Sequence, residues 1–405
     1  MESHDPTHQA TSAETGGTRI HQKLSPDTSM PFYEIDLLIF TPRDVDLARS
    51  PLRSTLKEET YVLGAFNPGL TRLPGGNLLM MVRVAEALRH PIRENQIHAI
   101  RWDREAGFLT DAYELAHVDA TDPRKFQILG HQCKVMALTS LSWLLPVELS
   151  PDGLEVLVAH YDKAVIPEAD YQQYGVEDAR ISRVGNRWYM TVCSVSAERH
   201  STTLYISDDG LNYELQGIVL DHQNKDMLIF EGQVNNKFFA LTRPLGDLYF
   251  AYPPGSAFVA GPSINLASSP DALHWKPTEG PLIRPRRGSS SVMKIGGGTP
   301  PILTPQGWLL LYHGVQPGTV VGVYRTFWAL LDLVNPERVL AVHDDAPILE
   351  ANTKLTAGLQ DLKYLSDVVF TTGIVEHNSD YIVASGEDDL ACRITHIPKN
   401  TFAAP

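Results

Sequence analysis

Glu177, Asp178 and Arg180 are the residues of this chain whose types and spacing are best suited to chemistry. They lie in the stretch Tyr174–Ile181, which reads Tyr-Gly-Val-Glu-Asp-Ala-Arg-Ile. Adjacent carboxylates with a cation beside them can donate, accept and stabilise charge, as general acid–base catalysis requires. The plainer interpretation is a solvated surface triplet. The pattern of the surrounding chain distinguishes this interpretation from a catalytic one.

The residues after this stretch predict a β-hairpin. Ile181–Val184 and Arg187–Cys193 are strand-like runs separated by the polar turn 185–186, Gly-Asn, and such a pattern is typical of two paired strands. The acidic residues therefore lie at one mouth of a hairpin, where functional side chains are more frequent than in a core.

The same unit, polar residues followed by a hairpin, recurs along the chain. Its copies have their turns at residues 74–77, 185–186, 235–236, 305–307 and 378–380, and the predicted first strand of the third copy is Phe230–Val234. Five such units, with other short strands between them and few amphipathic helices, predict an all-β protein, a five-bladed β-propeller. A two-sheet sandwich would explain the strands but not the recurring unit.

The inner strands of a propeller line one axial channel, so the recurring polar residues should converge there. Carboxylates, arginines and aromatic side chains in a funnel suit a neutral polyol such as a sugar. An inverting hydrolase needs its carboxyl groups ~6.5–9.5 Å apart, which residues on neighbouring blades can achieve and adjacent ones cannot. The predicted site comprises Asn67, Arg83, Glu177, Asp178, Arg180, Glu231, Arg243, Tyr312, His313 and Asp389.

Length and composition describe an ordinary soluble protein, with 405 residues, 43% of them hydrophobic and 20% charged. Residues 1–30 are polar and lack an apolar signal-peptide core, so they predict a disordered leader. Residues 31–405 are then a single propeller domain. No run reaches the ~20 apolar residues of a membrane helix.

Charge and cysteine usage narrow the partners and the compartment. The net charge of −14 opposes binding to nucleic acid or to an anionic membrane. The three cysteines, Cys133, Cys193 and Cys392, form no disulfide or metal pattern, which favours a cytoplasmic location. The fifteen histidines show no metal-ligand spacing, so we predict neither metal nor cofactor. The oligomeric state stays open, a homo-oligomer included.

Several motifs, in this order along the chain, resemble glycoside hydrolase family 130, the β-mannoside phosphorylases and β-mannosidases. The resemblance covers roughly residues 60–395. It implies a five-bladed propeller, an inverting mechanism on β-mannosides and no metal requirement. The motifs are Asn67-Pro68-Gly69 with Arg83, Gly175–Ile181, Asn224-Lys225-Asp226, Leu241–Pro244, Ser269–Asp271 with His274-Trp275, Ile295–Ile302 and Gly307–Val315.

The resemblance also implies roles for individual residues. The aspartate of the Glu-Asp-Ala-Arg motif is the family's proton donor, so Asp178 is the predicted general acid, its proton passing through a hydroxyl of the bound mannose. Asn67, Arg83 and Asp389 match mannose-binding positions, with Asp388 taking the last place if the alignment shifts by one residue. A purely structural role at strand ends is the alternative for the arginines.

Departures from the family pattern favour hydrolysis. The phosphorylases hold phosphate with an Arg, a Lys and a His, and the corresponding residues here are Ser201, Gln233 and Thr242, which carry no positive charge. Glu231 would repel phosphate and could activate water, so it is the predicted general base. Its alternatives are a solvated strand-end residue or a ligand to a sugar hydroxyl.

The predicted function is thus an inverting exo-β-mannosidase, with β-1,2-linked manno-oligosaccharides as the preferred substrate. A phosphorylase with a phosphate site rebuilt from Arg199, His200 and Arg243 is the first alternative. A non-catalytic sugar-binding propeller is the second.

Overall fold

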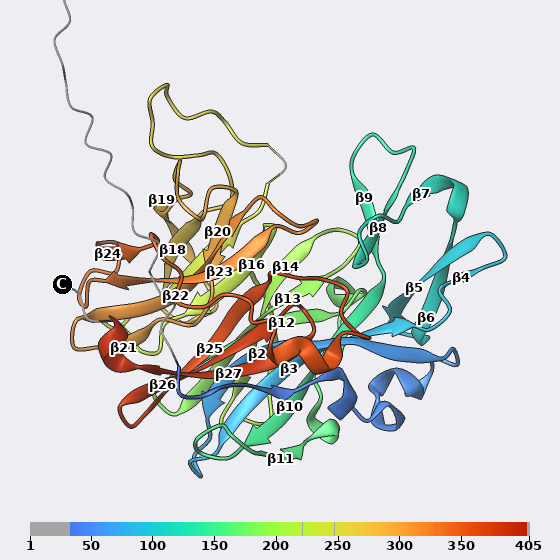
Figure 1. Ribbon diagram of the computed structural model, residues 1–405, viewed down its shortest axis with the longest axis horizontal. Coiled ribbons are helices and arrows are strands. Elements are labelled where there is room, and N and C mark those ends of the chain that lie inside the picture. The colour runs from blue at the N-terminus through green and yellow to red at the C-terminus, as the bar shows by residue number, and fades with distance from the viewer. Residues whose placement is uncertain (1–32, 221, 247, 403–405) are drawn as a thin grey trace, which may run out of the picture. The chain divides into compact units, whose positions relative to one another are not determined.

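The computed structural model of the chain describes residues 33–220, 222–246 and 248–402 (Figure 1). Within these ranges every regular element is a β-strand or a short 3-10 helix, which confirms the all-β prediction. The leader predicted at 1–30 lies outside the described residues. The 3-10 helices are η1 (Pro42–Asp44), η2 (Leu47–Arg49), η3 (Pro51–Ser54), η4 (Leu115–His117), η5 (Tyr161–Lys163), η6 (Asp170–Gln172), η7 (Leu355–Leu359) and η8 (Lys399–Phe402).

Five larger antiparallel sheets follow one another along the chain. The first contains β2 (Thr60–Arg72), β3 (Leu78–Leu88), β10 (Ser140–Leu149) and β11 (Val156–Ala159). The second contains β12 (Val176–Val184), β13 (Arg187–Val195), β14 (His200–Ser207) and β15 (Glu214–Leu220). The third contains β16 (Asn224–Ile229), β17 (Phe238–Pro244), β18 (Ile264–Ser269) and β19 (Lys276–Ile283).

The fourth and fifth sheets complete the series. The fourth contains β20 (Lys294–Gly297), β21 (Ile302–Thr304), β22 (Gly307–Gln316), β23 (Val323–Leu331) and β24 (Val339–His343). The fifth contains β25 (Val369–His377), β26 (Asp380–Glu387), β27 (Ala391–Pro398) and, from the other end of the chain, β1 (Asp36–Phe40).

The innermost strands of these sheets contact one another in sequence order. Strand β2 contacts β12, β12 contacts β16, β16 contacts β20, and β25 contacts both β22 and β2. In Figure 1 the labels of β2, β12 and β25 lie together in the middle of the view. The recurring unit in the sequence therefore corresponds to successive sheets whose first strands lie next to each other.

Apolar runs explain why the middle strands are buried. All but one residue of each of β3, β10 and β22 are inaccessible to solvent. A continuous apolar run of this kind is typical of a strand covered on both faces. Sheets packed face to face supply that cover, and the polar residues are left for the strand ends.

A β-bulge recurs at the same level of three innermost strands. The pairing shifts register between Phe66 and Gly69 in β2, between Glu177 and Arg180 in β12, and between Lys225 and Leu228 in β16. A residue with left-handed backbone lies in each bulge, and these residues are Asn67 (φ 49°), Asp178 (φ 54°) and Asp226 (φ 57°). Asn and Asp adopt this conformation more readily than most residues, and a bulge re-aims its side chain.

The third hairpin differs from its prediction. Phe230–Val234 was expected to be its first strand, but that strand is β16, which begins at Asn224 and ends at Ile229. The turn at Asn235-Asn236 lies where it was predicted, since both residues have positive φ and Val234 pairs with Lys237. Glu231 therefore lies near the turn, and Lys225 with Asp226 occupies the bulge that corresponds to Glu177 and Asp178.

Two small sheets are inserted between β3 and β10. They consist of β4 (Ile92–Arg93), β5 (Gln96–Asp103) and β6 (Gly107–Glu114), and of β7 (Val118–Asp119), β8 (Lys125–Ile128) and β9 (Val135–Leu138). They share an apolar cluster of their own, centred on the fully buried Phe126. This insertion projects from one side of the larger sheets (Figure 1).

Candidate active site

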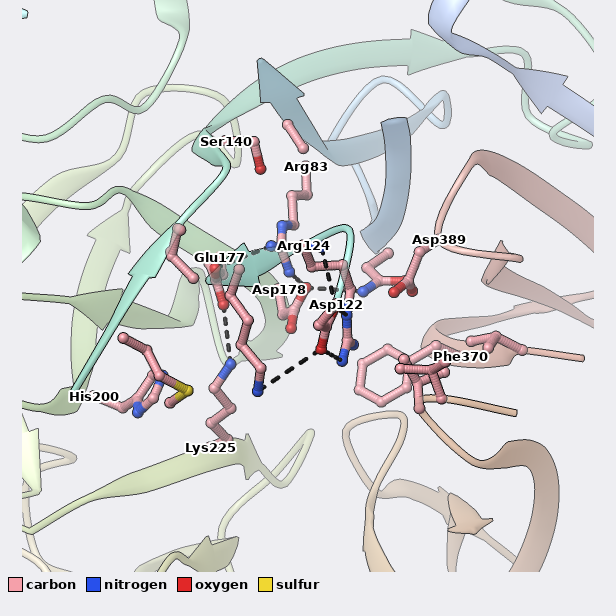
Figure 2. A pocket seen from close by; sticks show the side chains of 18 of the residues that line it. Arg83, Asp122, Arg124, Ser140, Glu177, Asp178, His200, Lys225, Phe370 and Asp389 are labelled. Carbon is pink, nitrogen blue, oxygen red and sulfur yellow. Dashed lines mark hydrogen bonds and ion pairs between the residues drawn. The ribbon is translucent and has the colours of Figure 1, made fainter. Parts of the chain in front are cut away.

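A cavity of about 700 Å³ opens at the end of the sheets where β12 and β16 begin. Residues from all five larger sheets and from the insertion line it. Six of the ten predicted site residues are among them: Asn67, Arg83, Glu177, Asp178, Arg243 and Asp389. Figure 2 shows Arg83 reaching toward Glu177 and Asp178, with Asp389 on the opposite side of the cavity.

Asp178 is a carboxylate with a side chain 11% exposed, and two donors hold it. Its Oδ1 accepts hydrogen bonds of 2.9 Å from both Asn67 Nδ2 and Arg83 Nη1. Burial alone would raise the pKa of Asp178, but Arg83, Lys225 and Arg180 hold that pKa well below its usual range. The side chain is therefore an ionised carboxylate with a fixed orientation.

Glu177 connects this carboxylate to a lysine on the next sheet. Arg83 Nη2 donates to Glu177 Oε1 at 2.9 Å, and Lys225 Nζ donates to Glu177 Oε2 at 3.0 Å. Burial opposes the charge on Glu177, but Arg83 and Lys225 keep its pKa lowered. Glu177 thus orients Arg83 toward the acid and Lys225 toward the cavity.

A second group of cations faces the cavity from the third and fourth sheets. Lys225, Arg243 and Lys294 all line it, and Arg243 Nη2 lies 2.9 Å from Asp226 Oδ2. Burial and the charge of Arg243 lower the pKa of Lys294 to about 8. Positive charge is therefore in excess around Lys294. A bound anion would offset this charge.

His200 lies near the same cations (Figure 2). Burial and the charge of Lys225 lower its pKa to about 4, so the imidazole is neutral near pH 7. It can offer a hydrogen bond to a ligand but adds no charge.

Asp389 and Arg124 face each other across the mouth. Burial raises the pKa of Asp389 to about 6, although Arg124 and Arg83 oppose the rise. Arg124 comes from the insertion and is held by Asp122, which accepts bonds of 3.1 and 3.0 Å from its guanidinium. In Figure 2 the Asp122–Arg124 pair lies between Asp178 and Asp389. Asp388, the alternative to Asp389, is instead buried and paired with Lys363 at 2.9 Å.

The insertion forms one wall of the cavity. Its lining side chains are mainly polar and of both charges, and they include Asp119, Thr121, Asp122, Arg124, Lys125, Gln127 and Lys134. None of them was among the predicted site residues, because they belong to no recurring unit.

Three predicted site residues lie behind the cavity wall. Arg180 is buried, and it donates to the carbonyl oxygens of Gly298 (2.6 Å) and Asp178 (2.8 Å). Tyr312 packs in an apolar core against Phe327. His313 is fully buried next to Arg243. None of the three is a lining residue, so each can affect a ligand only through its neighbours.

Glu231 does not lie in the cavity, contrary to the prediction. It lies two residues beyond the end of β16, and its backbone N–H donates to the carbonyl of Pro301 at 2.9 Å. Burial raises the pKa of its carboxyl group to about 7, with Glu376 contributing and Arg183 opposing. The strand rises about 3.3 Å per residue, so Glu231 is displaced from Asp226 toward the far end of the sheet.

The positions read from the sequence as lost phosphate ligands are not at the cavity either. Ser201, Gln233 and Thr242 are absent from its lining. Ser201 and Thr242 are buried within strands, and Gln233 is exposed near the hairpin turn. The absence of charge at these residues therefore says nothing about phosphate.

Two of the cations that were missed had a signal in the sequence. Lys225 belongs to the motif Asn224-Lys225-Asp226, and it occupies the place that Glu177 has one sheet earlier. Lys294 is the first residue of β20, just before a glycine run. Lys225 would have been predicted if the third copy had been aligned with the others at the bulge of its first strand. The prediction instead used the acidic residue nearest to the turn.

Two further findings concern metal ions and membranes in the described ranges. No group of three or more His, Cys, Asp or Glu side chains there is arranged to hold a metal ion. No helix in the same ranges is long and apolar enough to cross a membrane.

Carboxylates, cations and hydrogen-bonding side chains in one large cavity are typical of a site for a polyhydroxylated ligand. The model of glycoside hydrolase family 130, described as beta-1,4-mannooligosaccharide phosphorylase, matches residues 138–402. A beta-1,2-mannobiose phosphorylase of Listeria innocua is 31% identical over 89% of this chain and 93% of its own. The chain belongs to glycoside hydrolase family 130.

Two further similarities agree with this membership. A beta-1,2-mannobiose phosphorylase of a Thermoanaerobacter species is 32% identical over 62% of this chain and 76% of its own. The solved structure of the Listeria innocua enzyme, in complex with beta-1,2-mannobiose, superposes with a TM-score of 0.73 at 29% identity, over 90% of this chain and 95% of that one.

Proposed function

We propose that the protein is an inverting β-mannoside phosphorylase that cleaves β-1,2-linked manno-oligosaccharides with inorganic phosphate. The observation that carries the proposal is the group of cations, Lys225, Arg243 and Lys294, in the same cavity as Asp178. Phosphate is a multiply charged anion that needs cationic or N–H donors. The phosphorylase names of the similar proteins support the same function and suggest the β-1,2 linkage.

Hydrolysis, which the sequence favoured, loses its structural basis. It rested on Ser201, Gln233 and Thr242 as vacated phosphate positions and on Glu231 as a base, and none of the four lines the cavity. His200 and Arg243, named for the phosphorylase alternative, do line it. Phosphate brings its own nucleophilic oxygen, so phosphorolysis needs no carboxylate base.

The reaction assigns a task to each group. A phosphate oxygen held by Lys225, Arg243 and Lys294 attacks the anomeric carbon, the glycosidic C–O bond breaks, and the leaving oxygen takes a proton that originates from Asp178. Inversion of a β-mannoside then gives α-mannose 1-phosphate. Asn67, Arg83 and Asp389 are placed to bind the transferred mannose, and the insertion is placed against the leaving sugar.

Phosphate binding also prepares the acid. Lys225 helps to hold the pKa of Asp178 low. A bound phosphate offsets the charge of Lys225, so the pKa of Asp178 rises toward the value a proton donor needs. Binding of phosphate would therefore favour protonation of Asp178.

The proposal includes the five-bladed propeller predicted from the sequence. It is supported by the five larger sheets, by the contacts that run from β2 through β12, β16, β20 and β22 to β25 and back to β2, and by the family membership.

Lys225→Met tests the phosphate site. Loss of one charge-assisted contact should raise the phosphate KM about 10- to 100-fold, while the KM for β-1,2-mannobiose changes much less. The matched control is Lys237→Met, since Lys237 is an exposed lysine at the turn end of the same hairpin. An unchanged phosphate KM in Lys225→Met would count against a phosphate site at these cations.

A further inference from the structure

Arg83 has a third hydrogen bond, to a buried serine of the first sheet. Besides its bonds to Glu177 and Asp178, it donates from Nε to Ser142 Oγ at 2.9 Å. Ser142 lies in β10 and is 1% exposed. The donors of a guanidinium form a rigid planar fork, so an acceptor at Nε also fixes the direction of both Nη groups. Ser142 therefore influences how Arg83 meets the two carboxylates.

Strand pairing brings this serine next to the arginine. In the ladder of β3 and β10, Arg83 is paired with Leu144, and Ser142 is paired with Ala85. Residues two positions apart on a strand point to the same face, so the side chains of Ser142 and Arg83 are diagonal neighbours across the two strands. Ala85 carries only a methyl group. It therefore does not compete with Arg83 for the serine hydroxyl.

The backbone of the same serine contacts the strand that leads to the acid. Ser142 forms a parallel β-bridge with Gly175, which lies two residues before Glu177. Gly175 has a φ of 108°, and a Cβ there would lie 2.5 Å from the Ser142 carbonyl oxygen and 2.7 Å from its nitrogen. Such a close approach of two backbones needs glycine. Ser142 thus contacts the second sheet through its backbone and Arg83 through its side chain.

Gly175 is also fixed within its own part of the chain. Its N–H donates to the carbonyl of Gln172 at 2.9 Å, and its carbonyl accepts from the N–H of Val195 at 3.1 Å. Gln172 is fully buried, and its Nε2 donates to the hydroxyl of Tyr205 at 2.9 Å. The contact between Gly175 and Ser142 therefore connects the first sheet to a segment that is anchored in the second.

We propose that Ser142 is a positioning residue for the proton donor Asp178. Its hydroxyl directs the guanidinium of Arg83 onto the two carboxylates, and its backbone contact with Gly175 sets the spacing between that guanidinium and Asp178. Ser142 does not line the cavity, so it acts through Arg83. The inference rests on the proposed function in one respect, that Asp178 supplies the proton for cleavage of the mannoside, and it holds whether phosphate or water is the nucleophile.

Ser142→Ala tests this role by steady-state kinetics. It leaves Arg83 Nε without its acceptor, so kcat/KM for β-1,2-mannobiose should fall about 10- to 100-fold, with the phosphate KM within about twofold of wild type. Ser142→Thr keeps a hydroxyl and should recover most of the lost activity. Gly175→Ala displaces the Ser142 backbone and should lower kcat/KM for mannobiose in the same selective way.

Ser182→Ala is the matched control. Ser182 is also a strand serine that is 1% exposed, its Oγ donates to the carbonyl of Ile229 at 2.6 Å, and it does not line the cavity. This variant should have a lower melting temperature than wild type, with kcat and both KM values within about twofold.

Kinetic constants of Ser142→Ala that match those of Ser182→Ala would overturn the role of Ser142, as would an equal loss of activity in Ser142→Thr. Should Ser142→Ala fail to fold, Ser142→Cys takes its place, with an intermediate loss expected because a thiol is a weaker acceptor than a hydroxyl. Should Gly175→Ala fail to fold, the Ser142 variants decide.

This inference and the proposed function fail in different ways. The products that wild type forms with and without phosphate decide between phosphorolysis and hydrolysis. A phosphate-dependent wild type whose Ser142→Ala variant keeps its kcat/KM overturns only the role of Ser142. A phosphate-independent wild type whose Ser142→Ala variant loses activity overturns only the proposed phosphorolysis.

Discussion

Asp178 shows how a single carboxylate can be both fixed and reactive. Asn67 and Arg83 donate to its Oδ1, and Arg180 donates to the backbone carbonyl of Asp178. The bulge gives it a left-handed backbone with φ of 54°, which turns the side chain into the cavity. The residue is thus oriented from the backbone and from the side chain at once, as pre-organised catalysis requires.

Asp178→Asn keeps the shape of this residue and removes its proton. The amide oxygen still accepts from Asn67 and Arg83, so the site should stay folded. We expect kcat to fall about 10²- to 10⁴-fold and the phosphate KM to change little, measured as release of mannose 1-phosphate. A rate within about tenfold of wild type would remove Asp178 as the proton source.

Lys294 should give phosphate binding an alkaline limit. Its pKa is lowered to about 8, so the ammonium is charged below that pH and loses its charge as the pH rises through it. The phosphate KM should therefore increase above about pH 8 in wild type. Lys294→Arg keeps its charge and should shift this limit to higher pH, whereas Lys294→Met should have a high KM at every pH. A wild-type profile that is flat from pH 7 to 9 would contradict this assignment.

Glu231→Gln tests whether Glu231 lies outside the site, as in the structure, or is the general base predicted from the sequence. Glu231 lies outside the cavity, so turnover should stay within about twofold of wild type, where a catalytic base would lose about 10²-fold or more.

The folded pKa of Glu231, about 7, is raised above the unfolded value, so its protonated form stabilises the fold at low pH and that contribution is lost as the pH rises through 7. Gln should therefore raise stability at pH 8, by up to about 3 kcal/mol, and change it little at pH 4.

At the scale of elements, the third hairpin shows what sequence patterns can and cannot place. Phe230–Val234 has the apolar character of a strand, and Asn224–Asp226 has the polar character of a loop. The structure puts the polar residues into β16 because the cavity end of this strand carries a bulge, as do those of β2 and β12. The turn was predictable from Asn235-Asn236, but the register was not, since it depends on the neighbouring sheets.

The contribution of the inserted sheets to the cavity could not be predicted from the sequence either. Their lining residues meet the cavity only through the tertiary arrangement, in which β5 contacts β3 and β10 of the first sheet and β9 contacts β5, and no periodic pattern marks that arrangement. Arg124 is the clearest case, since its electrostatic partner Asp389 lies on the fifth sheet. Asn67, Arg83, Asp178 and Asp389, by contrast, were predictable, because each follows or precedes a recognisable hairpin.

Arg124→Met tests the insertion as a substrate-binding element. It removes the cation that faces Asp389 and leaves the apolar cluster around Phe126 intact. We expect kcat/KM for β-1,2-mannobiose to fall about 10- to 100-fold, the worth of a charge-assisted contact. Arg104→Met is the control, because Arg104 lies in the same insertion, is 61% exposed and pairs with Asp170 away from the cavity. Equal effects of the two changes would mean that the insertion acts only through stability.

At the scale of the whole molecule, strand β1 joins the two ends of the described chain. It completes the fifth sheet by pairing with β27. Arg393 donates to Asp36 at 2.6 and 2.8 Å and to the fully buried Glu387 at 2.9 Å. This buried network ties the first strand to the last sheet, and a sequence pattern gives no sign of it because the partners are at opposite ends of the chain.

Arg393→Met should therefore destabilise the fold strongly. It leaves Glu387 and Asp36 without their partner, and breaking a buried pair in this way costs about 3–5 kcal/mol. Urea unfolding measures the change. Arg338→Met, at a pair 3.7 Å long whose arginine is 71% exposed, should change stability by less than about 0.5 kcal/mol. A loss below about 1 kcal/mol in Arg393→Met would mean that β1 does not hold the sheet in place.

The net charge of the whole chain contrasts with the cations in the cavity, and this contrast supports the proposed phosphorolysis. The protein carries a net charge of −14, yet Lys225, Arg243 and Lys294 gather in one cavity beside an ionised Asp178. A site for a neutral sugar and water would have no need of these cations. Their presence is best explained by an anionic second substrate.

The most direct test is a product assay on β-1,2-mannobiose with and without inorganic phosphate. Phosphorolysis predicts mannose 1-phosphate and mannose in equal amounts, formed only when phosphate is present, with the α configuration at the new phosphate ester. Free mannose alone, released at a rate indifferent to phosphate, would contradict the proposed function and make the protein a hydrolase.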